Sequence, residues 1–122
     1  KGEEKETIEK IISEASKEEN ITKNKTLVKV LNLIVPSSFG KVSEIKQTSP
    51  NNYIVKLENP NKNLEFLPVN RDVLVNNKKI GKLHLTQEDE STLNLMFNLD
   101  ENYSATATIN KENNVIKVEI YR

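Results

Sequence analysis

Hydrophobic and polar residues alternate strictly over residues 92–99. The apolar positions of this segment are Leu93, Leu95, Phe97 and Leu99. Side chains of a β-strand point to opposite faces in turn, so one face of the segment is apolar and the other is polar. The shorter run at 83–85 has the same alternation, with His84 between two leucines, and the acidic stretch 87–90 separates the two runs. The pattern predicts an antiparallel hairpin with one buried face.

Short segments of the same kind follow one another from residue 41 to residue 121, with turns rich in Asn and Pro between them. Pro68 cannot donate a hydrogen bond to a strand neighbour, so it is expected at an edge or a break. The turn signals place strands at 42–48, 53–58, 64–67, 71–75, 79–86, 92–99, 103–109 and 115–121.

The segment before these strands, residues 27–35, reads LVKVLNLIV and is followed by Pro36. Its apolar spacing fits a helix, whereas its Val and Ile content fits a strand. A run this short is not decided by periodicity alone. We favour a buried strand and keep the helix as the alternative.

Residues 1–20 carry a narrow apolar stripe on an otherwise charged segment. Ile8, Ile11, Ile12 and Ala15 are spaced at i, i+3, i+4 and i+7, which predicts one face of a helix. With the polar residues 21–26, this gives an N-terminal amphipathic helix and linker over 1–26. The helix is either a stalk leading from an anchor or loosely docked on the domain.

The remaining chain, residues 27–122, is expected to form a single β-rich domain with two similar halves, at about 41–76 and 79–122. Each half opens with a Lys and then two apolar residues three positions apart, as in KVSEI and KIGKL. That spacing predicts a bulge early in each opening strand, and Gly81 is well suited to one. The predicted fold is mainly β, with two facing antiparallel sheets of short strands (β-sandwich-like), four strands in each, preceded by an N-terminal helix.

Composition and charge exclude several functional classes. The 122 residues carry 18 basic and 18 acidic side chains, so no basic field exists to attract nucleic acid. Cysteine is absent, which removes disulfides and thiolate chemistry. No stretch is apolar enough to insert in a membrane. Because the chain starts at Lys1 without Met, we expect a fragment that has lost an N-terminal export or anchor segment.

The sequence offers little for catalysis, cofactors or metals. His84 is the one histidine, and on a strand it points away from its neighbouring leucines, so it is expected to be incidental. The acidic residues at 88–90 lack the spacing of a calcium loop. The three glycines do not form a phosphate-binding motif. We therefore expect a protein that is not an enzyme and has no cofactor and no metal site.

The polar faces of the last strands are the most interesting surface. Hydroxyl and amide groups there could offer many donors and acceptors to a glycan, with Met96 among them. The alternative is an ordinary solvent-facing sheet. The candidate ligand-binding residues are Thr92, Asn94, Asn98, Thr106, Thr108, Lys117 and Tyr121.

The stretches KVSEIKQ, YIVKLENPN, IGKLHLTQED, TLNLMFNLDENY and VIKVEIY together resemble the AMIN domain, a non-catalytic localisation module of bacterial cell-wall amidases and secretins. The resemblance covers residues 40–122. An Arg that family members usually carry at the start of two strands is absent here. The resemblance implies an extracytoplasmic, cell-envelope module that contacts peptidoglycan and positions an attached enzyme or assembly. The alternative is a protein–protein assembly domain of an exported or lipid-anchored bacterial protein, acting through a sheet edge or its N-terminal helix.

Overall fold

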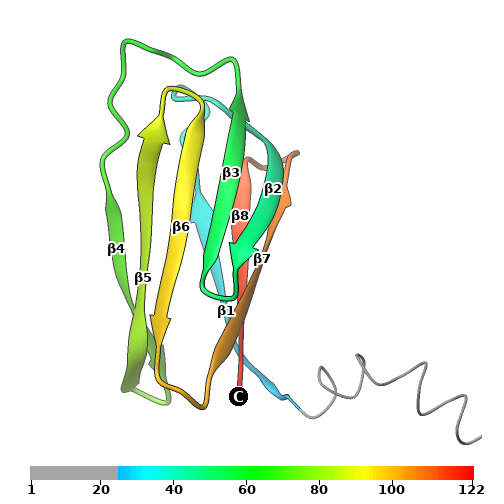
Figure 1. Cartoon of the computed structure of the whole chain (residues 1–122), viewed down its shortest axis with the longest axis vertical. Helices are drawn as coiled ribbons and strands as arrows, with labels where there is room; N and C mark the ends of the chain where they lie inside the picture. The colour runs from blue at the N-terminus through cyan, green and yellow to red at the C-terminus, as the bar shows by residue number, and fades with distance from the viewer. Residues whose placement is uncertain (1–24) are drawn as a thin grey trace, which may run out of the picture.

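Eight β-strands make up the part of the chain that the computed structural model describes, residues 25–122 (Figure 1). Within this range no helix is long and apolar enough to cross a membrane. The predicted N-terminal helix falls on residues outside this range. The strands are β1 (Leu27–Ile34), β2 (Lys41–Ser49), β3 (Asn52–Glu58), β4 (Val69–Val75), β5 (Lys78–Asp89), β6 (Thr92–Leu99), β7 (Ser104–Asn110) and β8 (Val115–Tyr121).

The strands form two antiparallel sheets, which confirms the mainly β, sandwich-like prediction. One sheet has five strands in the order β2-β3-β6-β5-β4, and the other has three in the order β1-β8-β7. The expected division into four and four strands is wrong. The β5–β6 hairpin pairs with β4 on one side and with β3 on the other, so strands from both predicted halves share the larger sheet.

Residues 27–35, for which strand and helix are the two alternatives, form strand β1 over Leu27–Ile34. It pairs antiparallel with β8, where Leu33 lies opposite Ile116. Leu33 and Val35 are buried, and Pro36 follows at once. The expectation that the whole strand is buried is wrong, because β1 is the outer strand of its sheet among the described residues and Leu27, Val30 and Ile34 are exposed. The strand is favoured because β-branched residues pack well on a pleated surface and because proline stops further pairing.

The predicted strand at 64–67 is absent, and residues 59–68 instead form the connection between β3 and β4. In this connection Phe66 is buried, whereas Leu64 and Leu67 are exposed. Pro68 removes a backbone donor at the point where pairing would have to continue. The four residues before it therefore follow the surface rather than a sheet.

Both predicted bulges are present. On β2 the register slips between Val42 and Glu44, and on β5 an extra residue, Ile80, stands opposite the step from Val73 to Leu74 on β4. Gly81 has a φ of 155°, and a Cβ there would lie 2.7 Å from Leu99 Cα. Only glycine fits this backbone conformation and this close approach to β6.

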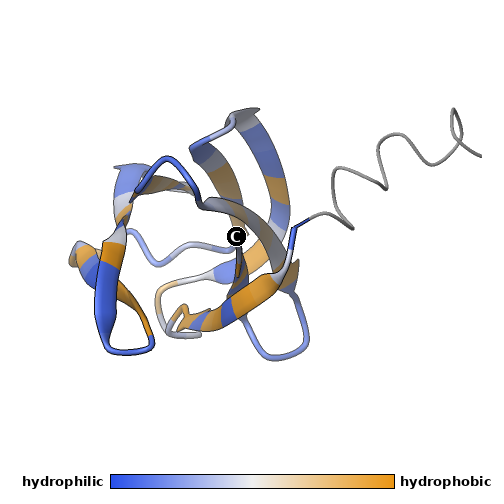
Figure 2. Cartoon of the chain, turned by 90° about the horizontal axis from the view of Figure 1, so that it is seen from below, coloured by the Kyte–Doolittle hydropathy of each residue, from blue (hydrophilic) through white to orange (hydrophobic). Residues whose placement is uncertain are grey.

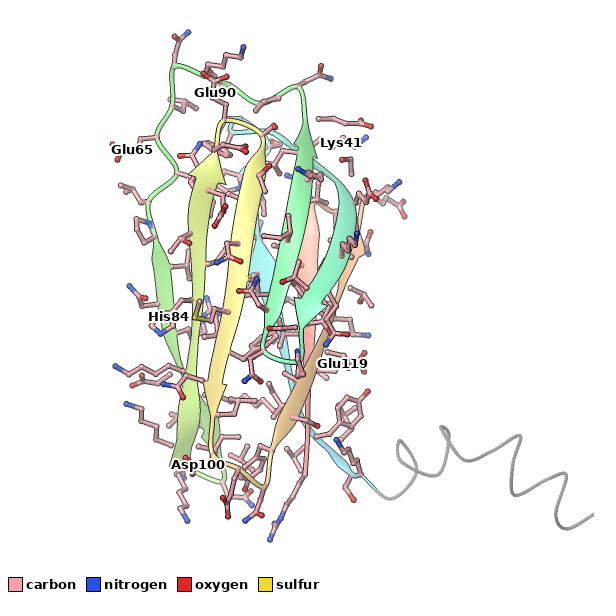
Figure 3. All side chains as sticks on the ribbon, viewed as in Figure 1. Lys41, Glu65, His84, Glu90, Asp100 and Glu119 are labelled. Atoms are coloured by element: carbon pink, nitrogen blue, oxygen red, sulfur yellow. The ribbon has the colours of Figure 1, made fainter. Side chains whose placement is uncertain are left out.

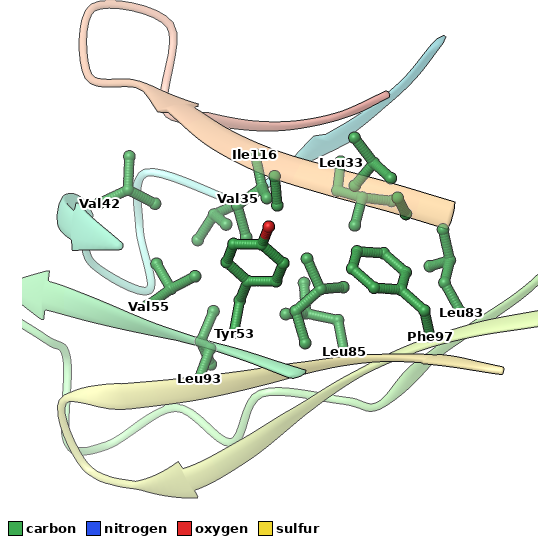
Figure 4. Packing of buried hydrophobic residues seen from close by; sticks show 14 of the residues in the cluster. Leu33, Val35, Val42, Tyr53, Val55, Leu83, Leu85, Leu93, Phe97 and Ile116 are labelled. Atoms are coloured by element: carbon green, nitrogen blue, oxygen red, sulfur yellow. The ribbon is translucent and has the colours of Figure 1, made fainter. Parts of the chain in front are cut away.

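The core lies between the two sheets and is filled from alternate positions of each strand. Figure 2 shows hydrophobic and hydrophilic bands alternating along the ribbons. Leu93, Leu95 and Phe97 of β6 are buried, which confirms the predicted inward face. Tyr53 and Phe97 meet edge to face with ring centroids 5.9 Å apart (Figure 4). The polar positions of the same strands are thereby fixed on the outer faces.

Candidate functional site

The outer face of the five-stranded sheet carries the amide groups that the sequence singled out on β6. Asn94 and Asn98 point outward because Leu93, Leu95 and Phe97 point into the core. The strand register determines which residues of β3 and β5 lie beside Asn94 and Asn98 on this face.

Met96 lies at the centre of this face. It stands opposite Asn52 of β3 and opposite His84 of β5. Its side chain is 45% exposed, the largest apolar contribution of β6 to the surface. His84 and Met96 are directly opposed on neighbouring strands and therefore lie on the same face of the sheet. Figure 3 shows His84 near the middle of β5. As predicted, His84 points away from Leu83 and Leu85, which are both buried.

A hollow of about 530 Å³ lies where the β2–β3 hairpin ends against β6. The tip of the hairpin is fastened to β6, because Phe97 N–H donates to Asn51 O at 2.9 Å. Beyond this bond β6 and β5 continue without a neighbour from β3, which leaves a step in the surface of the sheet. The lining residues are Thr48, Ser49, Asn51, Asn52, His84, Met96, Phe97 and Asn98.

Hydrogen bonds hold two side chains of the lining in place. Asn52 Nδ2 donates to Thr48 Oγ1 at 2.8 Å, and the Thr48 hydroxyl lies 3.3 Å from Asn52 O. His84 Nδ1 is hydrogen-bonded to Asn70 Oδ1. Asn70 lies on β4, so this contact holds the imidazole of His84 against the neighbouring strand.

Two amide oxygens on this face are left without a hydrogen-bond donor. Asn52 Oδ1 and Asn94 Oδ1 are shielded from solvent and accept no hydrogen bond from the residues that the structure describes. A shielded polar atom without a partner is costly.

A second, smaller hollow of about 170 Å³ continues the first along β3 toward its C-terminal end. It is lined by Glu44, Lys46, Thr48, Ile54 and Lys56, so Thr48 belongs to both. Lys56 Nζ lies 3.3 Å from Thr92 Oγ1 and donates to it. Thr92 is only 4% exposed, so this predicted site residue is largely covered and already has a partner.

The predicted binding surface is divided between the two sheets. Thr106, Thr108, Lys117 and Tyr121 lie on β7 and β8, in the three-stranded sheet, where Thr108 is opposite Lys117. The outer faces of a two-layer fold point away from each other, so one ligand cannot touch both groups. The expectation that all seven residues form one surface is therefore wrong, because β6 and β7 are consecutive in the chain but belong to different sheets.

Sequence reasoning missed Thr48, Asn51 and Asn52 as lining residues and set His84 aside. The turn at residues 49–52 was recognised, yet nothing in it indicates that it lies against β6. Alternation fixes the face of a residue, whereas the strand that lies beside it follows from long-range pairing.

The side chains that line the larger hollow supply amide, hydroxyl, thioether and imidazole groups. Among residues 25–122 no group of three or more His, Asp or Glu side chains is placed to hold a metal ion. His84 has an amide as its partner, and no hydrogen bond joins it to a carboxylate or a hydroxyl in the described part of the chain.

No family model, curated protein or solved structure matches this chain. The resemblance to the AMIN domain stays a prediction from its strand motifs.

Proposed function

We propose that this protein is a non-catalytic, extracytoplasmic module that binds cell-wall glycan on the outer face of its five-stranded sheet. In this proposal it positions an attached enzyme or assembly at the wall. The observation that carries the proposal is the hollow beside the β2–β3 hairpin, where neutral amide and hydroxyl groups surround the exposed side chain of Met96.

The polar groups of the hollow suit a sugar. A pyranose ring presents hydroxyl groups that both donate and accept hydrogen bonds, and the amides of Asn52 and Asn98 do the same. The C–H groups of such a ring need an apolar surface, which Met96 offers through a flexible thioether side chain. None of the residues lining the larger hollow is acidic or is Lys or Arg, which favours a ligand bound by hydrogen bonds.

The length of the surface also supports a polymer. The two hollows share Thr48 and follow β3, a strand of seven residues. Seven residues at about 3.3 Å each extend over roughly 23 Å. A linear glycan could therefore contact both hollows, with Lys46 and Lys56 at one end and Asn98 at the other.

Sedimentation of the full chain with purified, protein-free peptidoglycan tests this function. Retention in the pellet, and its loss when soluble glycan fragments compete, are the expected results. A chain that stays in the supernatant at every peptidoglycan concentration would refute wall binding.

A second candidate function, assembly with another protein, is favoured by the edge of the smaller sheet. Among residues 25–122, β1 pairs only with β8, and its residues Leu27, Val30 and Ile34 are exposed. An apolar edge strand invites pairing with a further strand. Failure to sediment with peptidoglycan, combined with stoichiometric co-purification of one envelope protein that is lost in a Val30→Pro variant, would support assembly instead.

A further inference from the structure

An apolar groove lies apart from the proposed glycan surface, between two connections that are at the upper end of the molecule in Figure 1. The connection from β1 to β2 forms one wall, and the connection from β3 to β4 forms the other. The groove has a volume of about 340 Å³. Its lining residues are Ile34, Pro36, Ser38, Phe39, Leu64, Glu65, Phe66, Leu67 and Val69.

The two most exposed large hydrophobic residues of the described part of the chain line this groove. Ile34 is 74% exposed, Leu67 is 72% exposed and Leu64 is 43% exposed, and all three line the groove. Single exposed apolar residues are ordinary, whereas a contiguous group of them around a hollow is a candidate docking surface.

The floor and walls of the groove are held by the domain itself. Phe39 and Phe66 are buried beneath it with ring centroids 5.1 Å apart. Asn61 N–H donates to Phe39 O at 2.7 Å, which ties the two connections together. The groove is therefore a formed feature of the fold that does not depend on an occupant.

The first 24 residues of the chain lie outside the described range, and their sequence supplies a matching apolar group. Ile8, Ile11, Ile12 and Ala15 are the apolar members of an otherwise charged segment, and their spacing predicts a single face. Glu65 is the one charged residue in the groove lining. The groove therefore favours an apolar stripe over a charged tail.

The chain is long enough to bring this stripe to the groove. The described chain enters at the far end of β1, where Thr26 and Arg122 exchange backbone hydrogen bonds of 3.1 and 2.9 Å. From Leu27 to Ile34 the strand advances by about 24 Å at roughly 3.4 Å a residue. The stretch from Ala15 to Thr26 can extend over about 36 Å at roughly 3.3 Å a residue.

We propose that the stripe of Ile8, Ile11, Ile12 and Ala15 docks in this groove of its own chain. The contact removes the exposed surfaces of Ile34 and Leu67 from water, and burial of apolar surface is its driving force.

Cross-linking of the full chain tests this docking, because the protein has no cysteine of its own. Ile11→Cys is combined with Leu67→Cys, and in the matched control with Leu74→Cys. Leu74 is an exposed leucine near the opposite end of β4 and does not line the groove. Docking predicts an intramolecular disulfide that forms on the order of tenfold faster with Leu67→Cys, because it raises the effective thiol concentration there.

Equal rates for the two pairs, or no intramolecular product, would overturn the proposal. A product formed only between two chains would overturn it too, since the groove would then hold the segment of a second copy. The mass and the electrophoretic mobility of the oxidised protein distinguish the intramolecular product from the product between two chains, and samples taken over time give the rates.

A second measurement needs no cross-link. In the full chain, Ile8→Ser, Ile11→Ser and Ile12→Ser together should shift the amide resonances of Phe66 and Leu67 and increase the fluorescence of an added hydrophobic dye. The matched variant replaces three charged residues of the same segment, Glu6, Glu9 and Lys10, by Ser and should leave both signals unchanged. Unaltered Phe66 and Leu67 resonances in the isoleucine variant would contradict docking.

Discussion

The side chain of Asn114 is hydrogen-bonded to the backbone of Val42, 72 residues earlier in the chain. Its Oδ1 accepts from Val42 N–H at 2.8 Å, and its Nδ2 donates to Val35 O at 2.7 Å and to Gly40 O at 2.9 Å. Asn114 belongs to the turn between β7 and β8, whereas its partners lie between β1 and the start of β2. The β1–β2 connection crosses from the smaller sheet to the larger one. The buried amide of Asn114 thus ties this connection to the β7–β8 turn of the smaller sheet.

Asn114→Ala should lower the free energy of unfolding by about 3 kcal/mol, because it leaves one buried N–H and two buried carbonyl groups without a partner. Urea denaturation measures the loss. Asn114 has a φ of 56°, so Asn114→Gly keeps the backbone conformation and removes only the side chain. A comparable loss in both variants assigns the effect to the hydrogen bonds. The exposed neighbour Asn113 is the control, and an equal loss in Asn113→Ala would contradict this account.

Phe97→Ala should cost about 3–5 kcal/mol, as a large-to-small change in a packed core. Phe97 is 3% exposed and packs against Tyr53. Met96→Ala, at the adjacent and exposed position of the same strand, should cost less than about 1 kcal/mol. Chemical denaturation of both variants separates the two faces of β6. Similar losses would mean that the strand does not present Phe97 to the core.

Gly81→Ala should destabilise the protein by about 2–3 kcal/mol, since alanine is strained at a φ of 155°. The added methyl group would also lie 2.7 Å from Leu99 Cα, a backbone atom that cannot move aside without disturbing β6. Lys82→Ala, one residue further along β5, is the control and should change stability by less than about 0.5 kcal/mol. A Gly81→Ala protein as stable as the control would show that the bulge relaxes without cost. Thermal unfolding followed by circular dichroism is sufficient.

The alternating pattern predicted which way side chains point but not which strands lie side by side. It placed Leu93 and Phe97 inside and Asn94 outside, because the two-residue period of a strand is a local property. It also located the bulge at Gly81. The partner of a strand depends on pairing over long distances in sequence, as between β3 and β6. For that reason the sequence did not indicate that one sheet has three strands and the other has five.

The prediction of the candidate site was incomplete for the same reason, because the pairing of distant strands has no local signal in the sequence. Asn94 and Asn98 were correctly placed on one outer face, while Thr106 and Thr108 were assigned to it because β7 follows β6 in the chain. A short connection can cross from one sheet to the other, and the turn at residues 100–103 does so. Asn52 joins the site through the β2–β3 hairpin, whose contact with β6 has no local signal.

Asp89 should titrate below the usual aspartate range. Ser91 N–H donates to its carboxylate at 2.9 Å, and this bond, followed by that of the Thr92 hydroxyl, lowers the pKa of the Asp89 carboxyl. Because the folded-state pKa is the lower one, the carboxylate stabilises the β5–β6 turn above the unfolded pKa of about 4. The contribution is lost as the pH falls through the folded pKa. An NMR titration of the side-chain carbon measures the midpoint.

In the Thr92→Val variant, which removes the second hydrogen bond, the midpoint should move up toward the ordinary value. The amide resonance of Ser91 should report the same midpoint as the carboxyl carbon. An ordinary midpoint in the unmodified protein, or a Ser91 amide that ignores it, would contradict the hydrogen bond as the cause.

Binding to peptidoglycan should depend on one sheet face and not on the other. Asn52→Ala with Asn98→Ala removes two amides that line the larger hollow on the outer face of the five-stranded sheet, and about tenfold weaker sedimentation is expected from the loss of roughly two hydrogen bonds. Thr106→Ala with Thr108→Ala removes two hydroxyl groups from the opposite side of the molecule and should leave binding unchanged. Both pairs should keep the melting temperature within about 3 °C, because these side chains point outward. Equal weakening by the two pairs, or weakening by the threonine pair alone, would move the glycan surface away from Met96.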